Sequence, residues 1–191
     1  MTRPTGPQDS PGFLLWRSTL RWQRTVAAAL RPLDLTHVQF VLLAAAWWLG
    51  AHRAASEPLP SQRQLAAHAD TDVMMTSQVV RVLERRGLVE RTADDAGDGR
   101  VKRLAVTDAG RDLAVRAVEV VEAADEAFFA RVPDHGRLLA VLGQLADLRV
   151  APPDVGQEGA LTGTAATSRS SGTRVARAVR DGPSSTARPG S

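Results

Sequence analysis

The segment from Ser61 to Gly110 constrains the fold of this chain more than any other stretch of its sequence. A short helical pattern is followed by a tight turn and then by a longer helical pattern that ends just before Gly87. Two short runs with strand-like alternation come next, on either side of a polar loop rich in Asp and Gly. This order of helix, turn, helix and hairpin predicts a winged helix-turn-helix.

Capping signals set the boundaries of the two helices. Ser61 is a suitable N-cap for a helix over residues 62–68. Either Thr71 or Asp72 can cap the second helix, which we expect over residues 73–86.

The hairpin follows directly from the end of the second helix. Gly87 stands where a left-handed residue closes a helix. Residues 88–92 and 101–106 then alternate as strands do, and the polar residues between them form a long hairpin loop.

Two helical patterns precede this segment. Residues 13–30 repeat apolar side chains at three- and four-residue spacing, and Pro32 ends that helix. Thr36 caps a second helix over residues 37–50, which is apolar nearly all round and is therefore expected to be buried.

Two more helices follow the hairpin. Thr107 caps a long helix over residues 108–132, and a last helix starts at Pro133 and Asp134 and continues to Leu148. The sequence thus predicts a mainly α fold with a small β-hairpin wing, in a folded body over 13–150. We expect residues 1–12 to be a disordered N-terminus and 151–191, rich in Gly, Ser, Thr, Pro and Arg, a disordered tail.

Composition excludes several classes of protein. The chain has no cysteine, which rules out disulfides, thiolate metal sites and thiol-based redox sensing. The longest apolar run, 40–49, is about half the length that a bilayer requires, and the polar N-terminus does not resemble a signal peptide, so we expect a cytoplasmic protein. The sequence has no glycine-rich phosphate loop, nucleophile elbow or metal-ligand spacing. We therefore expect no enzymatic activity, cofactor or metal.

The charge of the chain is a weak guide to its partner. The net charge is only +3, and between Ser61 and Arg103 the basic residues barely outnumber the acidic ones. Prediction of nucleic-acid binding must therefore rest on where the basic side chains stand.

The N-terminal half of the helix expected over residues 73–86 carries side chains suited to reading double-stranded DNA. Val79 and Leu83 are expected on its core side. The outward side then presents Met74, Met75, Ser77, Gln78 and Arg81. Gln suits adenine, Arg suits guanine, Ser accepts either, and Met can press on a thymine methyl group. The alternative is an ordinary solvated helix face, on which two adjacent Met residues would be unusual.

The hairpin supplies the second set of candidate DNA contacts, which are Asp98, Arg100, Lys102 and Arg103. Arg100 can insert in the minor groove, and Asp98 is close enough to orient its guanidinium group. The alternative is a solvated turn with a weak surface ion pair, since other acidic residues crowd this loop. Ser61 and Arg63, at the start of the helix over residues 62–68, are expected to contact phosphates.

These motifs together resemble the MarR family of dimeric winged-helix regulators. The matching stretches are Leu35-Thr36-His37-Val38-Gln39-Phe40, Leu65-Ala66, Leu83-Glu84-Arg85-Arg86-Gly87-Leu88-Val89, Asp98-Gly99-Arg100 and Leu104-Ala105-Val106-Thr107-Asp108-Ala109-Gly110. The resemblance covers 13–150. It implies a homodimeric transcriptional repressor of a palindromic operator, with helix 73–86 in the major groove and Arg100 in the minor groove. Met74 and Met75 depart from the small polar or basic residues common there, so base preference is not carried over.

Two further expectations concern partners. Phe13, Trp16 and Leu20, with the apolar stripe of the last two helices, offer more hydrophobic surface than a thin core can cover, which independently favours a dimer.

The resemblance also implies release from DNA by a small aromatic effector bound between the dimerisation helices and the winged-helix lobe. The candidate crevice residues are Trp16, Trp22, His37, Trp47 and Trp48. The alternative for the Trp residues is plain packing.

The main rival function is a winged-helix module for protein interaction that does not bind specific DNA. Such a module would have no need to keep Gln78, Arg81 and Arg100 together with Lys102 and Arg103.

Overall fold

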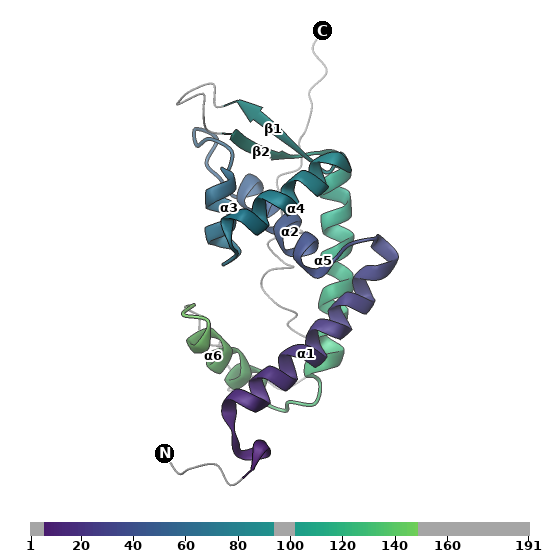
Figure 1. Cartoon of the computed structure of the whole chain (residues 1–191), viewed down its shortest axis with the longest axis vertical. Helices are drawn as coiled ribbons and strands as arrows, with labels where there is room; N and C mark the ends of the chain where they lie inside the picture. The colour runs from purple at the N-terminus through teal and green to yellow at the C-terminus, as the bar shows by residue number, and fades with distance from the viewer. Residues whose placement is uncertain (1–5, 94–101, 149–191) are drawn as a thin grey trace, which may run out of the picture.

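The computed structural model describes residues 6–93 and 102–148, and it confirms the predicted fold class (Figure 1). The α-helices are α1 (Pro11–Leu30), α2 (His37–Ala51), α3 (Gln62–His68), α4 (Val73–Arg85), α5 (Asp108–Phe129) and α6 (His135–Leu145). Two short 3-10 helices, η1 (Pro7–Asp9) and η2 (Arg31–Leu33), flank α1. Strands β1 (Val89–Ala93) and β2 (Lys102–Val106) form an antiparallel hairpin.

The elements form two connected parts. Helices α2, α3 and α4 and the hairpin make a compact lobe, while α1 and α5 pack along each other and extend away from it (Figure 1). Helix α6 is at the same end of the stalk as the N-terminal part of α1 in this view. The lobe is therefore the winged helix-turn-helix, and the long helices form a separate stalk.

Helix α2 occupies the centre of the molecule. Leu42, Leu43, Ala45 and Ala46 are buried, and α2 contacts α1, α3, α4, α5 and β2. Burial of a leucine side chain stabilises the fold by about 1.5–3 kcal/mol, and the buried residues of the surrounding elements join α2 in one core. The expectation of a buried helix here is confirmed.

The caps predicted from the sequence hold the helix-turn-helix. Ser61 and Gln64 form a capping box at the start of α3, with the Ser61 Oγ atom accepting from the Gln64 amide at 3.3 Å. At the end of α4, Gly87 has φ of 68°, the Gly87 amide donates to the Glu84 carbonyl and the Leu88 amide donates to the Leu83 carbonyl. This is a Schellman ending, and it turns the chain sharply into β1.

The hairpin is anchored to the lobe on both sides. Val89 pairs with Val106 at its base, and Leu104 is buried in the core. The amide of Leu104 donates to the Pro60 carbonyl at 2.9 Å, so the loop before α3 runs along β2. The wing is thus fixed to the first helix of the helix-turn-helix.

The structure corrects the predicted start of the first helix. Helix α1 begins at Pro11, within the segment expected to be disordered, because Ser10 Oγ accepts from the Phe13 amide at 3.4 Å and proline suits the first helical turn. Residues 1–5 and the tail predicted over 151–191 lie outside the described residues.

The ends of the later helices differ slightly from expectation. Helix α5 ends at Phe129, several residues before Pro133, and α6 ends at Leu145. Within the described ranges, no single helix is long and apolar enough to cross a bilayer; the stretch from α1 through η2 reaches that threshold only jointly with α2, and the two are bent by 74°.

Gly110 gives a test of how α5 is seated on the hairpin. A Cβ atom at this position would collide with the Leu88 carbonyl oxygen and lie 3.0 Å from Val106 Cγ1. Because the clash is with backbone, we expect Gly110→Ala to lower the free energy of unfolding by about 2 kcal/mol, measured by urea denaturation at a fixed protein concentration.

Gly50 in α2 is the matched control, since a Cβ atom there has nothing within 4 Å. Gly50→Ala should leave stability unchanged or raise it by up to about 1 kcal/mol through helix propensity. Equal effects of the two substitutions would contradict the close approach of α5 to Leu88.

Candidate nucleic-acid interface

Helix α4 presents a polar and thioether face away from the core. Met74 is 72% exposed, Met75 is 38% exposed, and Gln78 and Arg81 are also exposed. Ser77, the fifth residue predicted for this face, is half-buried. From Met74 to Arg81, α4 therefore offers an exposed surface to a partner.

The structure places Leu83 on the inward face of α4, as predicted, but Val79 only at the edge of that face. Thr76, Val80 and Leu83 are buried, whereas Val79, expected to face the core, is half-buried at its edge. The sequence reasoning missed Thr76 because a lone threonine on a helix gives no pattern that separates a buried hydroxyl from an exposed one.

Thr76 holds the turn of the helix-turn-helix. Its hydroxyl donates to the Asp72 carbonyl at 2.8 Å and lies 2.8 Å from the Thr71 hydroxyl, with which it is hydrogen-bonded. The Thr71 amide in turn donates to the Ala66 carbonyl of α3 at 2.9 Å. This buried network fixes the angle at which α4 leaves α3, and hence where its exposed face points.

The structure places the predicted wing residues differently from one another. Lys102 is exposed at the start of β2, whereas Arg103 is half-buried. The Arg103 guanidinium donates to the Leu59 carbonyl at 3.3 Å and to Gln64 Oε1 at 3.4 Å. Asp98 and Arg100 lie outside the described residues.

The two predicted phosphate contacts also differ. Arg63 is exposed on α3. The Ser61 hydroxyl instead donates to Gln64 Oε1 at 2.9 Å, and Ser61 forms a β-bridge with Arg103. Ser61 and Arg103 therefore contribute to holding the wing against α3.

Two more arginines near α4 are engaged in the fold. Arg86 pairs with Asp34 at 3.4 Å and donates to the Asp34 carbonyl at 2.6 Å. Arg91 on β1 pairs with Glu84 at 3.5 Å. These contacts fasten the C-terminal end of α4 to the turn before α2 and to the hairpin. The outward face at the N-terminal end of α4 is therefore the part that is accessible to a partner.

A second candidate site lies where α1, α2 and α5 meet. The Trp22 indole N–H donates to Asp125 Oδ1 at 2.7 Å, and the Trp22 and His37 rings meet edge to face with centroids 5.0 Å apart. Burial lowers the pKa of His37, against the opposing effect of the Asp125 charge. Burial raises the pKa of Asp125, although the Trp22 hydrogen bond and His37 act the other way.

The sequence could not reveal Asp125 as a partner of His37, since the two are far apart in the chain and share no motif. Each stands on a different helix, and only the packing of α5 against α1 and α2 brings them together. The result is a half-buried polar cluster of Trp22, His37 and Asp125 between the stalk and the lobe, which we call the junction cluster.

The other predicted crevice residues do not join this cluster. Trp47 and Trp48 pack against Val118 of α5, and the Trp48 ring also stacks on His52 with centroids 3.6 Å apart. Trp16 is 60% exposed and lies 6.1 Å from Phe13, between ring centroids, near the start of α1.

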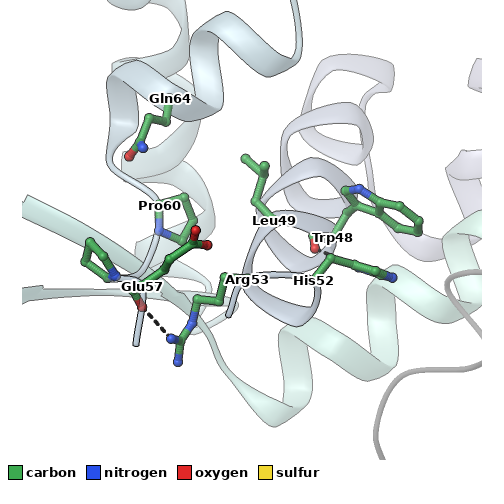
Figure 2. Close-up of a pocket in the computed structure, with 8 residues that line it drawn as sticks. Trp48, Leu49, His52, Arg53, Glu57, Pro60 and Gln64 are labelled. Carbon is green, nitrogen blue, oxygen red and sulfur yellow. Dashed lines mark hydrogen bonds between the residues drawn. The ribbon is translucent and has the colours of Figure 1, made fainter. Parts of the chain in front are cut away.

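Trp48 instead borders a shallow hollow of about 190 Å³ at the opposite end of α2 (Figure 2). Arg53 donates to the Glu57 carbonyl at 2.6 Å on its floor, and Gln64 of α3 closes one side. The five predicted residues therefore line more than one place in the protomer. In residues 6–93 and 102–148, no three His, Asp or Glu side chains gather where they could hold a metal ion.

The lowered pKa of His37 makes folding stability depend on pH. As pH falls through the usual value of 6.5, the unfolded chain takes up this proton before the folded protein does, so His37 lowers stability on acidification. Asp125 has the opposite effect on stability. Because its pKa is raised above the usual 3.8, the folded protein takes up this proton before the unfolded chain does, so Asp125 raises stability as pH falls toward 3.8.

We therefore expect the His37→Gln variant to lose less stability than the unchanged protein as the pH falls from about 7.5 to about 5.5. The difference should stay below the limit for one proton, about 1.4 kcal/mol per pH unit. Urea titrations across this range measure it, with the exposed His68→Gln as the control. Identical pH profiles for His37→Gln and the unchanged protein would contradict burial of His37.

Comparison with known proteins agrees with this architecture. Residues 35–102 match the MarR family. Over 141 residues the chain is 43% identical to the uncharacterized HTH-type transcriptional regulator YdcH of Bacillus subtilis, covering 74% of this chain and 92% of the relative.

Two solved structures are similar over most of the folded body. CouR from Rhodococcus jostii RHA1, bound to p-coumaroyl-CoA, is 33% identical with a TM-score of 0.60, covering 75% of this chain and 92% of CouR. The MarR family protein Rv2887 of Mycobacterium tuberculosis, in complex with DNA, is 33% identical with a TM-score of 0.54, covering 71% and 97%. The chain belongs to the MarR family of helix-turn-helix transcriptional regulators.

Proposed function

We propose that this protein is a homodimeric transcriptional repressor that binds a palindromic DNA duplex through the exposed N-terminal half of α4. The observation that carries the proposal is the outward face of α4, where Met74, Gln78 and Arg81 are exposed on one side of a well-anchored helix. A helix held in this way can enter the major groove without reordering.

The proposed contacts follow from side-chain chemistry. Gln78 suits adenine and Arg81 suits guanine, while Met74 and Met75 offer apolar contact with thymine methyl groups. Arg63 and Lys102 would contact phosphates, a role supported by their exposure on α3 and β2. The assignment of Arg100 to the minor groove and of Asp98 to orienting it rests on family resemblance.

Dimerisation accounts for the apolar surface left on one copy. The most exposed apolar side chains outside α4 are Trp16 on α1, 60% exposed, and Leu145 and Leu148 at the end of α6, each 68% exposed. Since α6 and the start of α1 lie at the same end of the stalk (Figure 1), a second copy can cover both. A two-fold axis would then place two α4 helices for the two halves of a palindrome.

This function is not enzymatic, and it places the protein in the cytoplasm with the chromosomal DNA. The relative CouR was solved with p-coumaroyl-CoA, and the junction cluster is the polar and aromatic site where a comparable aromatic effector would act on this chain. A ligand there would contact α1, α2 and α5 at once, and so shift the lobe relative to the stalk.

DNA binding and its specificity are tested together. With duplex DNA taken from beside its own gene, we expect tight binding that weakens steeply with salt, because phosphate contacts release counterions. Gln78→Ala and Arg81→Ala should each cost about 1–3 kcal/mol per half-site and relax base preference at one position, while Arg63→Ala weakens all sequences alike. Fluorescence anisotropy with a panel of single-base variants measures these changes.

Arg116→Ala, on an exposed position of α5, is the matched control and should leave affinity unchanged. Failure to bind any promoter-proximal duplex at low salt would favour the alternative of a winged-helix protein-interaction module. Equal, sequence-blind losses from all three substitutions would remove the assignment of Gln78 and Arg81 to base reading.

Release by an effector is tested with p-coumaroyl-CoA and free p-coumarate as probes. We expect one of them to quench tryptophan fluorescence and to raise the Kd for DNA. Trp22→Phe removes the hydrogen bond to Asp125 and should raise the Kd for the ligand about tenfold. Trp16→Phe, at the far end of α1, should not; a larger loss from Trp16→Phe would move the site away from the junction cluster.

A further inference from the structure

We propose that Met74 is a site of reversible oxidation by hydroperoxides, and that its oxidation lowers the affinity of this protein for DNA. The inference rests on the proposed function in that α4 must face DNA. The site itself is defined by the exposure of Met74 and its place on α4.

The start of α4 exposes three consecutive apolar side chains. Val73 is 48% exposed, Met74 is 72% exposed and Met75 is 38% exposed. Farther along the same face the exposed residues are Gln78, Arg81 and Arg85. Successive residues of an α-helix point about 100° apart, so it is Met74 that shares the face of these polar residues, with Val73 and Met75 on either side of it. Exposed apolar side chains gathered in one helical turn indicate a contact surface rather than a packing need, and here the one aligned with the polar residues is a thioether.

The sulfur atoms of the chain that could be oxidised lie mainly at the start of α4. The protein has no cysteine and three methionines, of which Met1 lies outside the described residues and the other two are Met74 and Met75. Since the chain holds no thiol, its thioethers are the sulfur groups that a hydroperoxide can oxidise. Because Met74 is almost twice as exposed as Met75, it should react first.

The reaction needs only the thioether and the hydroperoxide. A lone pair of the Met74 sulfur attacks one peroxide oxygen, an S–O bond forms and the O–O bond breaks. With hydrogen peroxide, the sulfur loses two electrons, the proton on the transferred oxygen passes to the departing hydroxide, and the products are the sulfoxide and water. Methionine sulfoxide reductases reverse the change at the expense of thiols.

Oxidation inverts the character of the contact. The thioether can pack on a thymine methyl group, whereas the sulfoxide carries a strongly polar oxygen that only accepts hydrogen bonds. The major-groove edge and the nearby phosphates present many acceptors, so the added oxygen has few donors to meet. A mismatch of this kind should weaken binding by about tenfold, the usual effect of one wrong base contact.

The first experiment locates the reaction without reference to regulation. The full chain is treated with hydrogen peroxide and analysed over time by tandem mass spectrometry. We expect one added oxygen on Met74 before Met75, and slower oxidation of Met74 when saturating operator DNA is bound. Faster reaction of Met75, or equal rates with and without DNA, would overturn the proposal.

The second experiment measures DNA affinity of each protein before and after peroxide treatment, so every variant serves as its own reference. We expect the Kd of the unchanged protein to rise about tenfold and to recover with methionine sulfoxide reductase and a thiol. The ratio should fall to about twofold or less for Met74→Leu and stay near that of the unchanged protein for Met75→Leu.

The outcomes separate the two proposals. If the reduced protein fails to bind promoter-proximal DNA, the proposed function fails and this inference with it. If the reduced protein binds but oxidation leaves the Kd unchanged, or if Met74→Leu remains as sensitive as the unchanged protein, only the oxidation proposal is overturned.

Discussion

The burial of α2 is the constraint on which the rest of the structure depends. Its sequence is apolar on every side, so the helix is stable only when other elements surround it. Both parts of the molecule meet this need, since α1 and α5 of the stalk and α3, α4 and β2 of the lobe all contact α2. The winged-helix lobe and the stalk therefore share one core, which is built around α2.

This arrangement gives the two ends of α2 different roles. At its first residue, His37 meets Trp22 and lies in the field of Asp125 on the stalk helices. At the other end, the loop after α2 leads to Pro60 and Ser61, whose backbone contacts hold β2 and the start of α3. The junction cluster and the segment that holds the wing thus lie at opposite ends of the same helix, α2.

Features governed by local chemistry could be predicted from the sequence. Capping residues gave α3 its observed bounds, and Gly87 has the left-handed conformation expected of it. Contacts between distant segments could not be predicted in this way. Asp125 reaches His37 only through tertiary packing, and Arg103, which the sequence suggests as a DNA contact, turns toward Leu59 and Gln64 because the loop before α3 runs along β2. Charge alone does not tell an arginine that holds the fold from one that faces a ligand.

The arginines near α4 divide into those that bind other parts of the protein and those that are exposed to a ligand. Arg86, Arg91 and Arg103 are all engaged with other parts of the protein. Among the described residues of α3, α4 and β2, the exposed cations are Arg63, Arg81, Arg85 and Lys102. With a net charge of only +3, the chain has little general attraction for DNA. In the proposed interface, affinity also depends on the fit of individual side chains in the groove, among which Met74 is the most exposed apolar one. A surface that relies on such a contact is sensitive to a chemical change of a single atom, and the sulfur of Met74 is the atom at which that change is easiest.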